Sequence, residues 1–188
     1  MALVQIVVGS VREKRIGRKV ADWFMETGAG RDDFELELVD LKEVNLPLFD
    51  EPNHPRFANY VHDHTKAWSE TVARADGFVF VTPEYNHSFP PALKNAIDYL
   101  SQEWKFKPAG FVSYGGVAAG TRAVQALKPV LACFQMPLVL ENVHIPFVGS
   151  LFNQDGAFVP PDGLDDAARL LHDRMAFWIE QQAGLRES

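Results

Sequence analysis

The chain has 188 residues, a length that predicts a single domain, residues 1–188, with a core large enough to be stable without disulfides. Its formal net charge of -7 argues against a nucleic-acid-binding protein, because such a surface must be basic. The single cysteine, Cys133, excludes an intramolecular disulfide and a cysteine-based metal cluster, and it fits a reducing compartment.

No apolar run approaches the length of a membrane span, and the basic residues near the amino terminus follow the first apolar run, whereas a secretory signal places them before it. We therefore expect a cytoplasmic protein with neither membrane nor nucleic-acid partners. Cys133 lies in the apolar stretch VLACF and is expected to be buried by packing. His54, His62 and His64 lack the acidic-histidine spacing of a metal site, so no metal is predicted.

The first elements along the chain are a strand, a helix and a second strand. Residues Leu3–Val8 are mostly apolar and β-branched, and Gly9-Ser10 ends them in a turn. Residues Ile16–Met25 repeat apolar side chains at helical spacing. Residues Phe34–Leu41, FELELVDL, alternate apolar and acidic side chains, which predicts an edge strand with one exposed face.

The middle of the chain contains its most informative stretch. Three prolines in Asn45–Pro55 predict a surface loop, and Phe57–Arg74 predicts a mostly polar helix. The run Phe78–Val81 is continuously apolar, as in a strand buried on both faces. A short helix follows from Pro90-Pro91 to Leu100, and the polar loop TPEYNHSF, Thr82–Phe89, separates strand from helix.

The last third of the chain continues the same alternation. A strand is predicted at Ala109–Ser113, a long helix at Ala118–Phe134 and a fifth strand at Met136–Leu140. Residues Glu141–Gly163 are punctuated by proline and glycine and predict an irregular excursion, and Leu164–Gln182 predicts a final amphipathic helix.

Five strands that alternate with helices predict an α/β sandwich with a parallel sheet, because parallel neighbours need crossover connections that cover both faces. We expect the strand order 2-1-3-4-5, since a second strand with one exposed face belongs at an edge. The order of strands then reverses between the first and third strands, which is where open α/β sheets bind ligands. The Gly9–Arg18 loop and the Thr82–Phe89 loop should meet there.

The first of these loops, GSVREKRIGR, favours an anion. It lies between a strand and a helix, so that backbone amides and the helix dipole attract negative charge, and Ser10 and Arg12 with Arg15 or Arg18 suit phosphate oxygens. It matches neither GxGxxG nor GxxxxGK[ST]. A simple solvated basic face stays open as the alternative, just as TPEYN could be an ordinary turn.

Three motifs carry a resemblance. GSVR before an early basic helix, TPEYNHSFPPALKNAIDYL, and SYGG after the fourth strand together resemble the NADPH-dependent FMN reductase family, a flavodoxin-like group that contains quinone, chromate and azo-dye reductases. The resemblance runs from Leu3 to about Leu140. It implies a flavodoxin-like three-layer sandwich that binds FMN.

The resemblance also implies a cofactor site, residue by residue. The FMN phosphate would be held by Ser10, Arg12, Arg15, Ile16 and Gly17. The isoalloxazine ring would be lined by Pro83, Glu84, Tyr85 and Asn86, with main-chain amides facing its polar edge, and the opposite wall would be Ser113, Tyr114, Gly115 and Gly116. No catalytic side chain is expected, because the flavin carries the chemistry.

The activity implied is hydride transfer from NADPH or NADH through bound FMN to a quinone, free flavin, azo compound or similar acceptor. The family resemblance also implies a homodimer or homotetramer, with Trp104 expected at the contact. A flavodoxin-type electron carrier is the alternative, although the arginines of the first loop contradict its usual uncharged phosphate loop. A receiver module lacks its acidic residues here, and a serine hydrolase lacks its GxSxG elbow.

Overall fold

A five-stranded, fully parallel sheet in the order β2-β1-β3-β4-β5 forms the centre of the protein, as predicted. The computed structural model describes residues 1–186. The strands are β1 (Ala2–Val8), β2 (Phe34–Asp40), β3 (Gly77–Pro83), β4 (Ala109–Tyr114) and β5 (Val143–Ile145).

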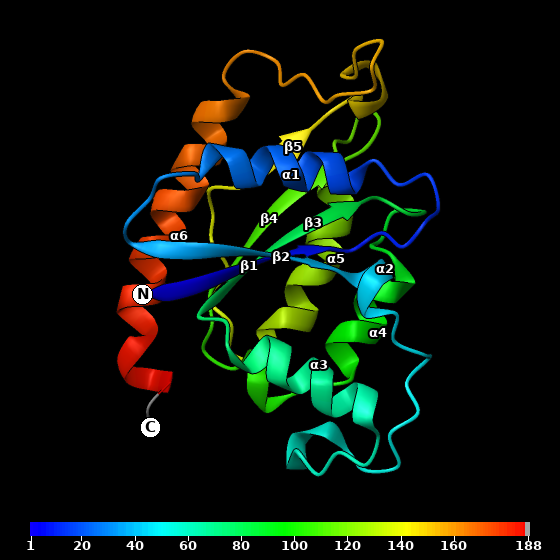
Figure 1. The fold of residues 1–188 in the computed structure, drawn as a ribbon, viewed down its shortest axis with the longest axis vertical. Coiled ribbons are helices and arrows are strands. Elements are labelled where there is room, and N and C mark those ends of the chain that lie inside the picture. Colours follow the sequence, from blue (N-terminus) through cyan, green and yellow to red (C-terminus); the bar gives the residue numbers. More distant parts are fainter. Residues whose placement is uncertain (187–188) are drawn as a thin grey trace.

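Helices cover both faces of this sheet (Figure 1). One layer contains α1 (Gly17–Thr27) and α6 (Leu164–Arg186), and the other contains α3 (Asp63–Ala73), α4 (Pro91–Asp98) and α5 (Thr121–Ala132). A single turn, α2 (Leu41–Val44), follows β2 directly. None of these helices, within residues 1–186, is long and apolar enough to cross a membrane.

The alternation of side chains along β3 explains its continuous apolar sequence. Phe78 and Phe80 are fully buried against α3, α4 and α5, whereas Val79 and Val81 are fully buried against α1 and α6. Because successive side chains of a strand point to opposite faces, a strand covered on both sides must be apolar throughout.

The fifth strand was predicted at the wrong residues. Met136–Leu140 makes only an isolated bridge, at Leu138, with the start of β4, and the regular strand is Val143–Ile145. Between them the chain leaves the sheet, and Asn142 Oδ1 accepts a hydrogen bond of 3.0 Å from the backbone N–H of Phe111. A side chain thus replaces the backbone acceptor that a continuous strand would supply.

The helix predicted at Phe57–Arg74 was wrong at its start. Residues Pro55–Phe57 form a short 3₁₀ turn, and α3 begins only at Asp63. The Glu51 carboxylate accepts the backbone N–H groups of Val61 and His62, at 2.9 and 3.0 Å, and this local hydrogen bonding holds the preceding segment outside the helix.

Two residues, Cys133 and Trp104, differ in exposure from what the sequence predicted. Cys133 is exposed, because α5 buries the face that carries Val124, Leu127 and Leu131 and ends with the cysteine on the solvent side. Trp104 is fully buried, with its ring centroid 4.8 Å from that of Phe78, so it belongs to the core and is not an exposed contact residue.

Candidate functional site

A cavity of about 280 Å³ lies at the carboxyl ends of β1, β3 and β4, where the two predicted loops meet. Most of the residues predicted for the site line it. The full lining comprises Ser10, Arg12, Lys14, Arg15, Ile16, Pro83, Glu84, Tyr85, Tyr114, Gly115 and Val148.

The first two loops are tied together directly. The Ser10 and Tyr85 hydroxyls are hydrogen-bonded at 2.9 Å, and the backbone N–H of Gly9 donates to the carbonyl of Val81 at 2.9 Å. Ser10 is only 2% exposed. The loop after β1 therefore has a defined position relative to the loop after β3.

The loop after β3 is a tight hairpin turn. Tyr85 and Ser88 exchange two backbone hydrogen bonds, of 2.8 and 2.9 Å, around Asn86 and His87, which have φ angles of 49° and 66°. Two positive φ angles in a two-residue turn are typical of type I′. Asn86 is exposed at the tip of this turn and lies outside the cavity lining, so the structure gives it a role in shaping the loop.

The cations of the first loop differ in what they contact. Arg15 Nη2 donates to Asp40 Oδ2 at 2.5 Å, and the Asp40 side chain is fully buried. Arg18 binds Asp22 outside the cavity, and its hydrogen bond to that carboxylate raises the pKa of the guanidinium. Arg12 and Lys14 are exposed and form no ion pair within residues 1–186. These two side chains are available for an anion.

Close packing surrounds the start of α1. A Cβ atom on Gly17 would overlap the hydroxyl of Tyr114, so no larger residue fits there without displacing that ring. Tyr114 is 4% exposed, and burial raises the pKa of its phenol. Gly17 itself does not line the cavity, but it lets the Tyr114 hydroxyl lie against the first helical turn.

Two of the predicted residues, Ser113 within β4 and Gly116 just after it, form hydrogen bonds to neighbouring segments. Ser113 is fully buried; its hydroxyl donates to the carbonyl of Ala119 at 2.8 Å and lies 2.7 Å from His144 Nδ1. Gly116 is exposed, and its carbonyl accepts from the backbone N–H of Phe147 at 3.1 Å. Neither belongs to the lining.

Other residues of the site were not predicted from the sequence. Val148 reaches the cavity from the irregular segment after β5, and nothing in its local sequence signalled this. Arg122, from the first turn of α5, binds Glu84. Asp40 had a signal that could have been used, because it is a carboxylate at the carboxyl end of a strand.

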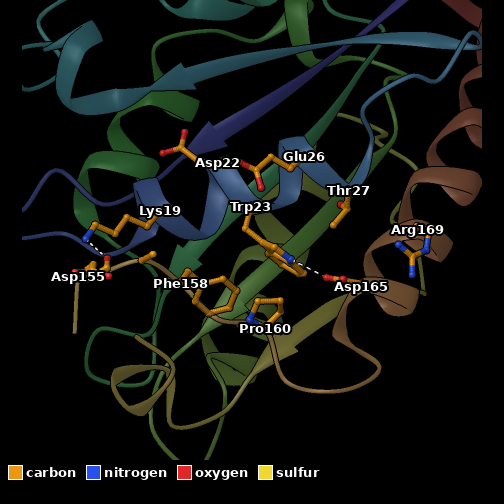
Figure 2. Close-up of a pocket in the computed structure, with 12 residues that line it drawn as sticks. Lys19, Asp22, Trp23, Glu26, Thr27, Asp155, Phe158, Pro160, Asp165 and Arg169 are labelled. Carbon is orange, nitrogen blue, oxygen red and sulfur yellow. Dashed lines mark hydrogen bonds between the residues drawn. The ribbon is translucent and has the colours of Figure 1, made fainter. Parts of the chain in front are cut away.

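A larger cavity, of about 620 Å³, lies elsewhere, between α1, the 155–160 segment and the start of α6 (Figure 2). Trp23 Nε1 donates to Asp165 Oδ1 at 2.8 Å across it, and Lys19 Nζ donates to the carbonyl of Gly156. These bonds fasten the 155–160 segment and α6 to α1. None of the predicted site residues lines this cavity.

The fold and the cavity define a class of protein. A doubly wound sheet of this strand order, with an anion-favouring loop after β1 and a second loop after β3 at its switch point, is the arrangement of flavodoxin-like proteins. The chain matches the family described as NADPH-dependent FMN reductase over residues 2–149. It therefore belongs to that family. The family assignment confirms the prediction of an FMN-dependent oxidoreductase.

Individual relatives agree with this assignment. An NAD(P)H-dependent FMN reductase of Schizosaccharomyces pombe is 45% identical over 71% of this chain and 67% of its own length. A quinone reductase of Pseudomonas putida is 32% identical over 94% of both chains. The flavoenzyme NAD(P)H:(acceptor) oxidoreductase FerB of Paracoccus denitrificans shares the fold, with a TM-score of 0.75, 24% identity and coverage of 97% and 99%.

The residues of the cavity fit FMN. Two buried polar atoms on lining residues have no hydrogen-bond partner in the described part of the chain: the donor Arg15 Nε in the first loop, and the acceptor Glu84 Oε2 in the second. Buried polar groups are almost always paired, so both atoms point to a ligand or water. FMN has an anionic phosphate, which could accept from Arg15 Nε, and a ring N–H, which could donate to Glu84 Oε2.

Proposed function

We propose that this chain is a cytoplasmic FMN-dependent NAD(P)H oxidoreductase and that residues 1–188 act as one FMN-binding domain. Its small-molecule acceptor is a quinone, free flavin, azo compound or similar oxidant. The observation that carries the proposal is the cavity itself. It combines two cations of the loop after β1 that form no ion pair within residues 1–186 with a fixed, aromatic loop after β3. The names of the relatives support the choice of acceptor class.

The first loop would bind the phosphate. Arg12 and Lys14 supply charge that no carboxylate within residues 1–186 neutralises, and Arg15, held by Asp40, supplies the buried Nε. Charge-assisted hydrogen bonds to a phosphate are stronger than neutral ones, so these residues would contribute most to the affinity for FMN over riboflavin.

The second loop would position the ring. Pro83 is buried at the end of β3, and the Tyr85 hydroxyl is held by Ser10, so these residues present a rigid wall. Bound FMN would supply the two-electron redox chemistry. The chain contributes binding, orientation and partial exclusion of water, and no side chain needs to act as a nucleophile or base.

An absorption spectrum tests the proposal. The purified protein should show flavin bands, release FMN on denaturation, and consume NADPH or NADH steadily when a quinone is added. Flavin bands without such consumption would favour the flavodoxin-type carrier instead. A protein that takes up no flavin after incubation with FMN would overturn the proposal.

We also propose that the protein is a homodimer or homotetramer. Leu48 and Phe57, in the segment between α2 and α3, are 84% and 71% exposed, and large exposed apolar side chains favour an interface. Sedimentation should give a mass above the 21.1 kDa of one chain. The double variant Leu48→Ser/Phe57→Ser should lower that mass, whereas Val117→Ser, at an exposed position after β4 and outside the segment between α2 and α3, should not.

A further inference from the structure

Glu84 has one carboxylate oxygen that nothing in the described chain satisfies. Its side chain is only 10% exposed, it lines the cavity at the carboxyl ends of the strands, and Oε2 is buried without a donor. An ionised carboxylate oxygen that is removed from water and left unpaired is costly. The position is therefore explained best by a donor that belongs to a ligand.

Arg122 holds this carboxylate from the side of α5. Its Nε donates to Glu84 Oε1 at 2.6 Å, and its Nη2 contacts the same oxygen. Nε and Nη2 are thus both directed at Oε1, and Oε2 is left without a partner in the described part of the chain. A carboxylate in an ion pair can only accept hydrogen bonds.

The chemistry of the missing donor can be narrowed. FMN offers two kinds of neutral donor: the hydroxyls of the ribityl chain, and the single N–H of the oxidised isoalloxazine ring, at the imide nitrogen N3. Glu84 belongs to the loop after β3, which would position the ring, so the imide N–H is the donor that its side chain would meet. This inference rests on the proposed function, because it assumes a flavin in this cavity. We propose that the Glu84 side chain accepts a hydrogen bond from the imide N–H of the flavin, and that Arg122 is a positioning residue that directs Oε2 toward it.

The proposal differs from the expectation drawn from the sequence, in which the ring is held by main-chain amides. Amide N–H groups are donors and suit the ring carbonyls and nitrogens, but they cannot satisfy the imide N–H. Glu84 Oε2 supplies the acceptor that the amides lack. A carboxylate in this position would also select for a ring that carries an N–H over one that does not.

A pair of ligands without phosphate tests this selection: riboflavin and N3-methylriboflavin, titrated into protein freed of flavin, with binding followed by flavin fluorescence. The wild type should bind N3-methylriboflavin about tenfold to a hundredfold more weakly, the range expected for a charge-assisted hydrogen bond. Equal binding of the two by the wild type would overturn the inference without any variant.

The variant Glu84→Gln separates the hydrogen bond from a steric clash with the methyl group, because it keeps the size of the side chain. If the carbonyl oxygen of the introduced amide accepts from Arg122, its NH₂ group is a donor directed at the imide N–H. The affinity of Glu84→Gln for riboflavin should therefore fall to about its affinity for N3-methylriboflavin. Its affinity for N3-methylriboflavin should stay close to that of the wild type. Riboflavin binding equal to that of the wild type would overturn the inference.

Two controls complete the experiment. Glu141→Gln breaks another arginine–glutamate pair, with Arg174, outside the cavity, and should leave both affinities unchanged. Arg122→Ala should reduce the discrimination between the two flavins, and Arg122→Lys should restore part of it; discrimination retained in full by Arg122→Ala would refute the positioning role. If the wild type takes up neither FMN nor riboflavin, the proposed function fails, whereas riboflavin binding without discrimination overturns only this inference.

Discussion

The hydroxyl groups of Ser10 and Tyr85 lie 2.9 Å apart and join two loops that are separated by 75 residues of chain. This hydrogen bond crosses the point where the sheet reverses its strand order, and Ser10 is almost fully buried there. The relative position of the two loops, and so the shape of the cavity between them, depends on a contact between side chains.

The first prediction concerns this pair. Ser10→Ala and Tyr85→Phe should each lower the free energy of unfolding by about 1 kcal/mol, because each leaves a partner hydroxyl without its hydrogen bond. The double variant should lose less than the sum, with a coupling of roughly 0.5 to 1.5 kcal/mol in urea unfolding. Strict additivity would show that the two hydroxyls do not interact in solution.

The second prediction concerns Arg12. Arg12→Ala should weaken FMN binding by about tenfold to a hundredfold, because the loss of a charge-assisted contact to phosphate costs roughly 1.5 to 3 kcal/mol. Riboflavin, which has no phosphate, should bind the variant and the wild type equally. Titration of both flavins measures this contrast.

Arg18→Ala is the matched control for Arg12, since Arg18 lies near it in the chain but binds Asp22 and Glu43 outside the cavity. It approaches Asp40 only at 3.8 Å, whereas Arg15 binds that carboxylate at 2.5 Å. The FMN affinity of Arg18→Ala should stay close to that of the wild type. Equal losses for FMN and riboflavin in Arg12→Ala would indicate a damaged fold, and no loss for either would mean that this arginine only contacts solvent.

The third prediction concerns the contact between Gly17 and Tyr114. Gly17→Ala should destabilise the protein by roughly 1 to 3 kcal/mol, because the new methyl group would overlap the Tyr114 hydroxyl. Gly17→Ala/Tyr114→Phe should regain most of this loss in thermal unfolding. Gly184→Ala, in α6 with open space around its Cβ, should instead be neutral or slightly stabilising. A Gly17→Ala variant as stable as the wild type would contradict the packing described.

The fourth prediction concerns pH. His172 is fully buried between α6 and α1, and this burial lowers its pKa from 6.5 to about 4. The unfolded chain therefore binds a proton at this residue between pH 6.5 and about 4 while the native protein does not, so stability should fall as the pH falls through that window, by on the order of 3 kcal/mol.

Urea unfolding at several pH values measures this effect, and His172→Phe should flatten the curve, because the ring stacked on Phe24 is kept and the titrating group is removed. The same slope in His172→Phe as in the wild type would assign the acid sensitivity to other groups, of which His144 is one: burial also lowers its pKa, and Lys128 lowers it further.

The fifth prediction concerns turnover. If the nicotinamide and the acceptor both react at the cavity at the switch point, the two should bind in turn. Initial-rate plots against NADPH at several quinone concentrations should then be parallel. Intersecting lines would require both substrates to be bound at once and would contradict a single shared site.

The architecture could be predicted because the pattern of apolar side chains along a strand shows which of its faces are buried. A continuous apolar run at Phe78–Val81 requires cover on both faces, and the alternation of FELELVDL permits one exposed face, which places β2 at an edge. The fifth strand could not be located in this way. Met136–Leu140 is as apolar as a strand, and only the tertiary structure shows Asn142 taking the hydrogen bond that ends its pairing.

The site could be predicted only in part, for a related reason. Loops at the carboxyl ends of neighbouring strands meet at one edge, so Ser10 and Tyr85 could be brought together from the sequence. The partners that orient the charged residues come from other elements: Asp40 from the end of β2 and Arg122 from the start of α5. Such pairs depend on the packing of helices against the sheet, which no local pattern encodes.

Because all five strands run parallel, their amino ends lie at one end of the sheet and their carboxyl ends at the other. The start of β1 and the last turns of α6 lie near each other at the amino ends of the strands (Figure 1), and Ala2, Phe34 and Ile179 border a cavity there. The cavity of the candidate site lies at the opposite, carboxyl ends. A protein tethered to an electrode through a tag on either β1 or α6 would hold its cavity toward the solution. The same asymmetry means that a fusion partner attached there would leave the path of dissolved acceptors open.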